Sequence, residues 1–165
     1  MDGQAILARL RARLGGRVLE THDFRGDHTG VVAREAILDA LAFCRDDPGL
    51  AFDLLVDITA VDYLEFPGRE DGPRFEVVYH LYATAHNHRV RLKVRVEEDD
   101  ARVPTACALW PIADWLEREV WDMFGVRFEG HPDLRRLLLY EEFVGHPLRK
   151  DYPINRRQPL IGPKV

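Results

Sequence analysis

Two histidines stand in the same local motif, Gly-His-Pro, with carboxylates close by in the sequence. They are His131 and His146, and the nearby carboxylates belong to Glu117, Glu119 and Glu129. Imidazole and carboxylate groups are common zinc ligands and common general acids and bases. No pair of them has HExxH spacing, and a ligand set drawn from separate loops cannot be read from a sequence. The sequence therefore predicts no metal site, and a metal-dependent hydrolase that uses these glutamates and histidines is a remote alternative.

Other catalytic chemistry has little support in the chain. Glu117, Glu119 and Asp122 could exchange protons if they were buried, but an ion-paired, helix-capping set is the favoured interpretation. No GxSxG, P-loop or GxGxxG motif is present. The two cysteines, Cys44 and Cys107, lack CxxC spacing, which favours small buried side chains in a reducing compartment. The sequence predicts no catalytic and no cofactor-binding residue.

The stretch from Asp114 to Pro153 interleaves charged and aromatic residues more densely than the rest of the chain. Proline disfavours the helical conformation of the residue before it, so His131 and His146 are expected to be extended. Each Gly-His-Pro then forms a fixed corner. A buried segment cannot hold so many charges without partners. We therefore expect a surface that contacts either the rest of the chain or another protein.

A short amphipathic helix is predicted over residues 114–124. Asp114 and Glu117 have the spacing of a capping box at its start, and Gly125 is placed to end it in the left-handed conformation. The stripe expected to face the core is Leu116, Val120, Met123 and Phe124. The pair expected on the opposite, charged face is Arg118 and Asp122. This outer face is flanked by two large aromatic rings, Trp115 and Trp121.

The rest of the chain has the pattern of an α+β domain with two layers, a mainly antiparallel sheet covered by helices. Alternation with a period of two predicts strands over residues 52–61, 75–82 and 90–96. Apolar spacing predicts helices over Asp2–Leu14 and Arg34–Cys44. Two further short strands are expected over Val18–Thr21 and Gly30–Ala33, joined by a turn over His22–Thr29.

Charge and apolar content change near the end of the chain. Residues 134–165 hold seven basic and three acidic side chains, whereas residues 1–133 hold 16 basic and 25 acidic ones. From about residue 139 onward, few apolar residues recur at a regular helical or strand spacing. We therefore expect a globular domain over residues 1–138 and an extended C-terminal arm over residues 139–165. The acidic body argues against nucleic acid as a partner. No apolar run reaches the 18 or so residues of a membrane-spanning helix, and no secretory signal pattern begins the chain.

Several runs closely resemble the signature of one known family. They are Glu117–Val126, Phe128–Leu137 and Gly145–Pro153, with support from Asp57–Tyr63. The family is the 30 kDa subunit of respiratory complex I, which in bacteria is the C subunit of NADH-quinone oxidoreductase. The resemblance covers about residues 52–153.

The resemblance implies a non-catalytic scaffold and assembly role in the peripheral arm of the proton-translocating complex I (NDH-1). That translocase passes electrons from NADH through FMN and iron–sulfur clusters to quinone, and this chain would hold none of these cofactors. Its implied partners are the hydrogenase-like large subunit (the D subunit) and the terminal-cluster subunit (the B subunit). Its implied location is the cytoplasmic side of the bacterial inner membrane, with membrane contact only through the complex. A sibling subunit of a membrane-bound hydrogenase or of a cyanobacterial-type NAD(P)H dehydrogenase complex is the open alternative.

The motif residues are expected to form a partner-docking surface. Its arginines would pair with acidic groups of the partner, and its aromatic rings would be anchors. The same residues could instead pin the arm to its own domain, and both can hold together. The predicted docking residues are Glu117, Arg118, Glu119, Trp121, Asp122, Phe124, His131, Pro132, Arg135, Arg136, His146, Pro147, Arg149, Lys150, Asp151 and Tyr152.

Overall fold

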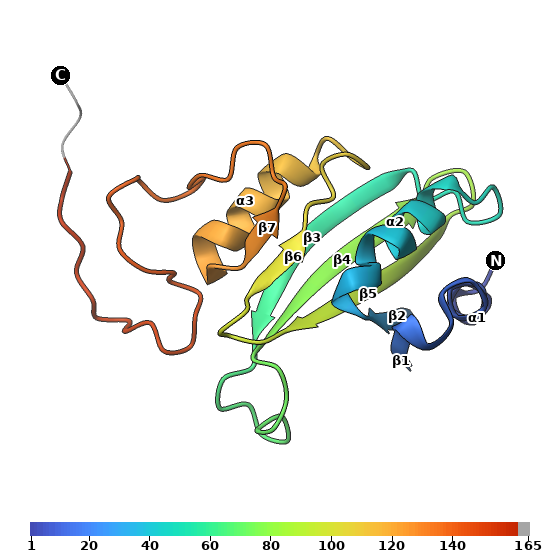
Figure 1. The fold of residues 1–165 in the computed structure, drawn as a ribbon, viewed down its shortest axis with the longest axis horizontal. Helices are drawn as coiled ribbons and strands as arrows, with labels where there is room; N and C mark the ends of the chain where they lie inside the picture. Colours follow the sequence, from blue (N-terminus) through green and yellow to red (C-terminus); the bar gives the residue numbers. More distant parts are fainter. Residues whose placement is uncertain (162–165) are drawn as a thin grey trace.

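The structure is a computed structural model and describes residues 1–161. Its largest element is a five-stranded sheet with the order β1–β2–β5–β4–β3 (Figure 1). Neighbouring strands run antiparallel except for β2 and β5, which are parallel, so the prediction of a mainly antiparallel sheet is confirmed. The strands are β1 (Val18–Phe24), β2 (Asp27–Val32), β3 (Leu54–Asp62), β4 (Phe75–Ala83) and β5 (His88–Val96).

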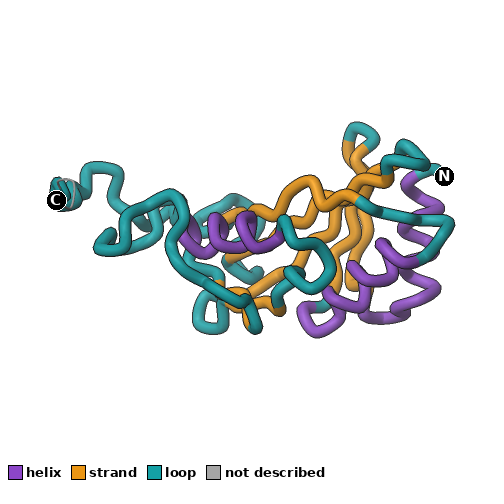
Figure 2. Tube along the Cα trace, turned by 90° about the horizontal axis from the view of Figure 1, so that it is seen from above, coloured by secondary structure: helices purple, strands orange, loops and turns teal. Residues whose placement is uncertain are grey.

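The α-helices of residues 1–161 lie on one face of this sheet, as Figure 2 shows. They are α1 (Gly3–Leu14), α2 (Ile37–Asp46) and α3 (Ala113–Phe124), with short 3-10 turns at Gly15–Arg17 and Arg34–Ala36. Buried apolar side chains of the helices and of the inner sheet face join in one core, as Ile6, Leu41 and Tyr79 illustrate. Beside α3, a small parallel ladder pairs β6 (Arg102–Pro104) with β7 (Arg127–Glu129).

The first hairpin is longer than predicted, and the turn proposed over His22–Thr29 is wrong. β1 and β2 continue through most of that stretch, so Arg25 and Gly26 alone make the turn. Both residues have positive φ, +54° and +81°, which is the backbone that two-residue hairpin turns use. The polar residues of this stretch belong to the strands because they pair across the hairpin. For example, Nδ1 of His28 lies 2.8 Å from Oδ2 of Asp23.

The sheet face opposite the helices is organised by one buried carboxylate, that of Glu76 on β4. Its oxygens accept hydrogen bonds from Lys93 at 2.8 Å and from Arg69 at 3.0 Å, although the side chain is only 1% exposed. Burial alone would raise the pKa of Glu76, but the hydrogen bonds from the two cations and from Tyr63 lower it to about 2. These contacts tie the 64–74 loop to the sheet.

We predict that Glu76→Gln lowers the free energy of unfolding by about 1–3 kcal/mol at pH 7, because the partly buried cations lose their counter-charge. The native pKa lies below the unfolded value, so the stabilisation is present above about pH 4.5 and is lost as the pH falls toward 2. Urea unfolding between pH 2 and 7 measures both effects. Glu35→Gln, at an exposed position, is the control. Equal stabilities of the Glu76 variant and the control would contradict this account.

Candidate docking face

Asp122 on α3 organises the chain that follows β7. Its carboxylate oxygen Oδ2 accepts the consecutive backbone N–H groups of Leu137, Leu138 and Leu139 at 3.0, 2.8 and 2.9 Å. Its other oxygen accepts a hydrogen bond from Arg136 at 2.6 Å. Successive N–H groups of this kind form an anion-binding concavity. Burial alone would raise the pKa of Asp122, yet these donors hold it below the ordinary value.

The second Gly-His-Pro corner caps the C-terminal end of α3. The last carbonyls of a helix have no partner within the helix. Here the carbonyl of Asp122 accepts from Nδ1 of His146 at 3.0 Å, and that of Met123 accepts from the N–H of Leu148 at 3.1 Å. The carbonyl of Phe124 accepts from Nε of Arg149 at 2.6 Å.

Gly125 ends α3 in the left-handed conformation, with φ +77°, as predicted. A Cβ at this position would lie 2.7 Å from the His146 ring and 2.8 Å from the Arg149 guanidinium. Glycine is therefore required both by the backbone angle and by the close approach of the second corner.

The first Gly-His-Pro corner contacts the opposite end of the same helix. Nε2 of His131 donates to the carbonyl of Asp114 at 3.1 Å, and its Nδ1 accepts the N–H of Asp133 at 3.0 Å. The two imidazoles thus bind carbonyls eight residues apart, about 12 Å along a helix. His131 and His146 do not converge, so the sequence-based hydrolase alternative lacks its common site.

A third attachment joins the segment to the sheet. Arg74 at the loop before β4 contacts both oxygens of Asp62 and both oxygens of Asp151, with shortest distances of 2.8 and 2.7 Å. Asp62 also accepts the N–H of Lys150 at 2.8 Å. The hydrogen bonds that Arg74 donates to these carboxylates, above all to Asp62, raise the pKa of Arg74 above its ordinary value. This side chain is buried, so a nearly inaccessible cation holds Asp151 against the body while its partner Asp62 holds Lys150.

The predicted capping box of α3 is wrong. The N-cap is Ile112, which has no side-chain capping bond, and Asp114 lies inside the first turn. Glu117 is fully buried and accepts from Oγ1 of Thr105 and the N–H of Ala106, both at 2.6 Å. The Glu117 carboxylate therefore accepts hydrogen bonds from buried donors on the turn after β6, and it does not cap the N-terminal end of α3.

The predicted Arg118–Asp122 pair is also not formed. Asp122 turns to Arg136, while Arg118 lies 3.8 Å from Asp114 and donates to the carbonyls of Arg135 and Arg136 at 3.2 Å. Asp122 takes tertiary partners, and Arg118 combines tertiary carbonyls with a different helix neighbour, Asp114; both charges are buried in this way. An exposed i,i+4 pair would contribute only about 0.2–0.5 kcal/mol.

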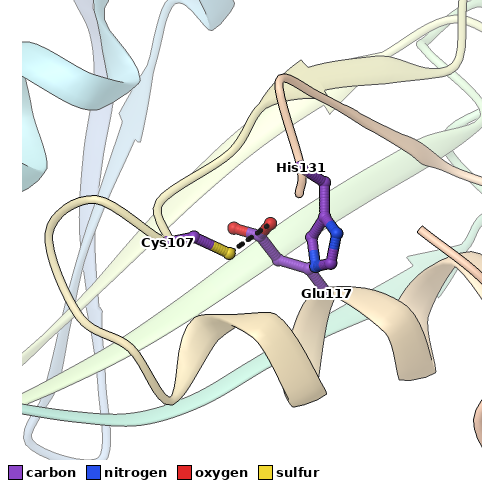
Figure 3. Close-up of side chains that lie close together, drawn as sticks. All are labelled: Cys107, Glu117 and His131. Carbon is purple, nitrogen blue, oxygen red and sulfur yellow. Dashed lines mark hydrogen bonds between the residues drawn. The ribbon is translucent and has the colours of Figure 1, made fainter. Parts of the chain in front are cut away.

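Three side chains each place one potential metal-ligand atom within 4.8 Å of the other two (Figure 3). They are Cys107, Glu117 and His131. The chemistry of this group does not fit a resident metal. A ligating histidine donates its second ring N–H to an acceptor, but Nδ1 of His131 faces the N–H donor of Asp133. Burial, opposed by the Thr105 hydrogen bond, raises the pKa of the Cys107 thiol to about 11. The group instead anchors the first corner and the turn after β6 to α3.

The structure distributes the sixteen predicted docking residues over different degrees of exposure. The buried ones are Glu117, Arg118, Asp122 and Phe124. The partly exposed ones are Trp121, His131, Arg136, His146, Pro147, Arg149 and Tyr152. The exposed ones are Glu119, Pro132, Arg135, Lys150 and Asp151. Many of their polar groups are thus used within the chain, and contact of the exposed ones with a partner remains a prediction.

Trp115 lies at the outer face of α3, as the sequence predicted; it is 55% exposed and lies beside Arg118. Sequence reasoning missed a set of exposed aliphatic side chains that follow this helix. After β7, no helix or strand forms within residues 130–161, and apolar side chains there point outward. They are Leu138, Val144, Leu148, Ile154 and Leu160. The sequence pattern that could have revealed them is a series of apolar residues without helical or strand spacing. Such a pattern indicates an apolar surface that another molecule covers.

Residues 146–151 are hydrogen-bonded to α3 and to the sheet, so the structure does not confirm an arm that leaves the body at residue 139. Residues 162–165 of the predicted arm lie outside the described part of the chain. Among the helices of residues 1–161, none is both long enough and apolar enough to span a membrane.

We predict that Asp122→Asn lowers the free energy of unfolding by about 3 kcal/mol, because three N–H donors and Arg136 lose their anionic acceptor. Trypsin should also cleave sooner at Arg136 and Arg149. Denaturant unfolding and timed digestion with mass spectrometry measure these effects. Glu119→Gln, an exposed carboxylate on the same helix, should behave as the unaltered chain. Similar digestion of both variants would exclude Asp122 as the anchor.

Comparison with known proteins shows a family. The model of "Respiratory-chain NADH dehydrogenase, 30 Kd subunit" matches residues 31–158. The C subunit of NADH-quinone oxidoreductase from Roseiflexus sp. (strain RS-1) is 48% identical over 96% of this chain and 88% of that protein. The protein of the same name from Geobacter sulfurreducens is 44% identical over 98% of this chain and 97% of that protein.

Two solved structures are similar to this fold. The trypsin-resistant fragment (1–134) of Nqo5 has a TM-score of 0.70 and 36% identity, and the match covers 81% of this chain and all of that one. A chain of the membrane-bound sulfane sulfur reductase, an archaeal respiratory membrane complex, has a TM-score of 0.74 and 28% identity over 93% of this chain and 86% of that one. By sequence and by fold, this chain belongs to the 30 kDa subunit family of respiratory-chain NADH dehydrogenase.

Proposed function

We propose that this chain is a non-catalytic scaffold and assembly subunit of the peripheral arm of a proton-translocating NADH:quinone oxidoreductase. In that complex electrons pass from NADH through FMN and iron–sulfur clusters, all held by other subunits, to quinone. The proposed place of the chain is the cytoplasmic side of the bacterial inner membrane. Relatives that carry the name of a subunit of this oxidoreductase support the proposal.

One observation carries the scaffold role: a segment with several exposed apolar side chains is attached to the body by buried charges. Asp122 and Arg74 hold the segment without using these apolar side chains. Leu138 is 61% exposed, Val144 56% and Leu148 52%. Large exposed apolar side chains on one segment favour a protein partner, because water contact with them is unfavourable.

We propose that the partner covering this surface is the hydrogenase-like large subunit, with the terminal-cluster subunit nearby. The exposed cations Arg135 and Lys150 would face acidic groups of this large partner, and Trp115 and Leu148 would be apolar anchors. Within this proposal residues 1–138 are the domain and residues 139–165 the docking arm. Nqo5 has a trypsin-resistant fragment of residues 1–134, which agrees with such a division in that protein.

A second candidate function has one specific observation in its favour. A chain of an archaeal sulfane sulfur reductase shares this fold at 28% identity. A sibling role, in a membrane-bound hydrogenase or a cyanobacterial-type NAD(P)H dehydrogenase complex, would use the same docking surface with a different electron donor.

An affinity pull-down separates these candidates. A tag on the N-terminus, far from α3 in Figure 1, would be used on membranes solubilised in mild detergent. Recovery of the hydrogenase-like and terminal-cluster subunits together with the FMN-binding protein supports the NADH:quinone oxidoreductase. Recovery of a nickel-containing hydrogenase moves the chain to a sibling complex. A chain recovered without any of these proteins overturns the scaffold role.

We predict that Leu148→Glu weakens association with the hydrogenase-like large subunit by about 2 kcal/mol, roughly 30-fold, because a charge then faces the apolar partner surface. Leu19→Glu on β1 is the matched control, since that leucine is 57% exposed and Leu148 is 52% exposed. Titration calorimetry with the purified partner gives both affinities. Equal affinities of the two variants would remove Leu148 from the docking surface.

A further inference from the structure

The side-chain amide of Gln158 helps to close the C-terminal part of the chain into a loop. Its oxygen Oε1 accepts the N–H of Val144 at 3.4 Å, and its Nε2 donates to the carbonyl of Val144 at 2.9 Å. Nε2 also donates to the hydroxyl of Tyr152 at 2.8 Å. The Gln158 side chain thus pairs with a backbone 14 residues away as a neighbouring strand would.

Aromatic contacts fill the inside of this closed loop, residues 140–159. The rings of Phe143 and Tyr152 stack with centroids 6.1 Å apart, and Tyr140 meets Phe143 edge-on at 5.7 Å. The hydroxyl of Tyr140 donates to the carbonyl of Pro159 at 3.0 Å, so the two ends of the loop are joined. Gly145 has φ +103°, and a Cβ there would lie 2.8 Å from the Tyr152 ring.

Several aliphatic side chains of the closed loop are exposed, among charged ones. Val144 and Leu148 are more than half exposed, and Ile154 is fully exposed. A loop stabilised only by its own contacts would be expected to turn these side chains inward and to leave the amide of Gln158 in water. In the structure the Gln158 amide is bound to Val144 and Tyr152, while these aliphatic side chains stay exposed. The loop is therefore shaped before any partner covers it.

The conformation of the free loop affects affinity, because ordering a flexible segment on binding costs conformational entropy. A segment that orders only on binding loses part of its interaction energy to the conformational entropy of its backbone. Contacts that order the segment in advance raise affinity without touching the partner.

We propose that Gln158 is a positioning residue that holds the closed loop in its docking conformation before the hydrogenase-like large subunit is bound. The inference rests on the proposed function, and it adds a residue that the family signature runs do not include. The amide acts on the free chain, so its loss lowers the fraction of molecules that are ready to bind.

The test compares Gln158→Ala with Gln4→Ala, in which the chain's other glutamine, exposed on α1, is changed. Two quantities are measured: the dissociation constant with the purified large partner, and the hydrogen exchange rate of the Val144 N–H in the free chain. Gln158→Ala is expected to weaken binding about three- to tenfold and to speed Val144 exchange by a similar factor. Tyr152→Phe, which removes one of the amide's hydrogen bonds, is expected to have a smaller effect in the same direction.

The outcomes separate this inference from the proposed function. If the unaltered chain does not bind the large partner, both fall. If it binds and Gln158→Ala binds equally well, the positioning role alone is overturned. Weaker binding without faster Val144 exchange would make Gln158 a direct contact of the partner, which also overturns it. Thermal unfolding of all variants, expected to be unchanged because Gln158 lies outside the core, excludes a general loss of folding.

Discussion

The buried carboxylate of Asp122 is the interaction on which the end of this molecule depends. It receives three consecutive backbone N–H groups and one guanidinium, so a segment without helix or strand gains the hydrogen bonds that regular structure would otherwise supply. Because α3 is packed into the core through Val120 and Phe124, this acceptor has a fixed position. The irregular segment therefore takes its shape from a rigid helix.

α3 is used along its whole length for this purpose. The first Gly-His-Pro corner binds near its start through His131, and the second binds its final carbonyls through His146. Each ring meets a carbonyl oxygen, which can only accept, so each bonding nitrogen carries a proton. Nδ1 of His131 accepts an N–H, and burial lowers the pKa of His146 below its ordinary value. Proline stiffens each corner, which reduces the entropy lost on ordering it.

The proposed scaffold role would use both parts of this arrangement. Buried charges are unfavourable without partners, so Arg74, Asp62 and Asp122 act within the chain, where every contact is available before assembly. In the proposed function, exposed aliphatic side chains such as Leu148 would contact the partner, because burial of apolar surface is the main source of association energy. Predicting docking residues from charge and aromatic content alone mixed these two roles. Both kinds of residue belong to the same motifs, and exposure alone separates them.

Local patterns in the chain were enough to predict the mainly antiparallel sheet, the amphipathic helix ending at Gly125 and the family, because period, glycine placement and ordered motifs need no knowledge of distant contacts. The same patterns placed Glu117 at a helix cap and paired Arg118 with Asp122, since neighbours along a helix are the only partners a sequence displays. Tertiary contacts placed these groups differently: Glu117 binds the turn after β6, and Asp122 binds the N–H groups of residues 137–139. They also closed the last loop through Gln158. Electrostatic interactions are strongest where water is excluded, so a buried carboxylate binds the donors that are buried beside it. In this fold those donors are distant in the sequence.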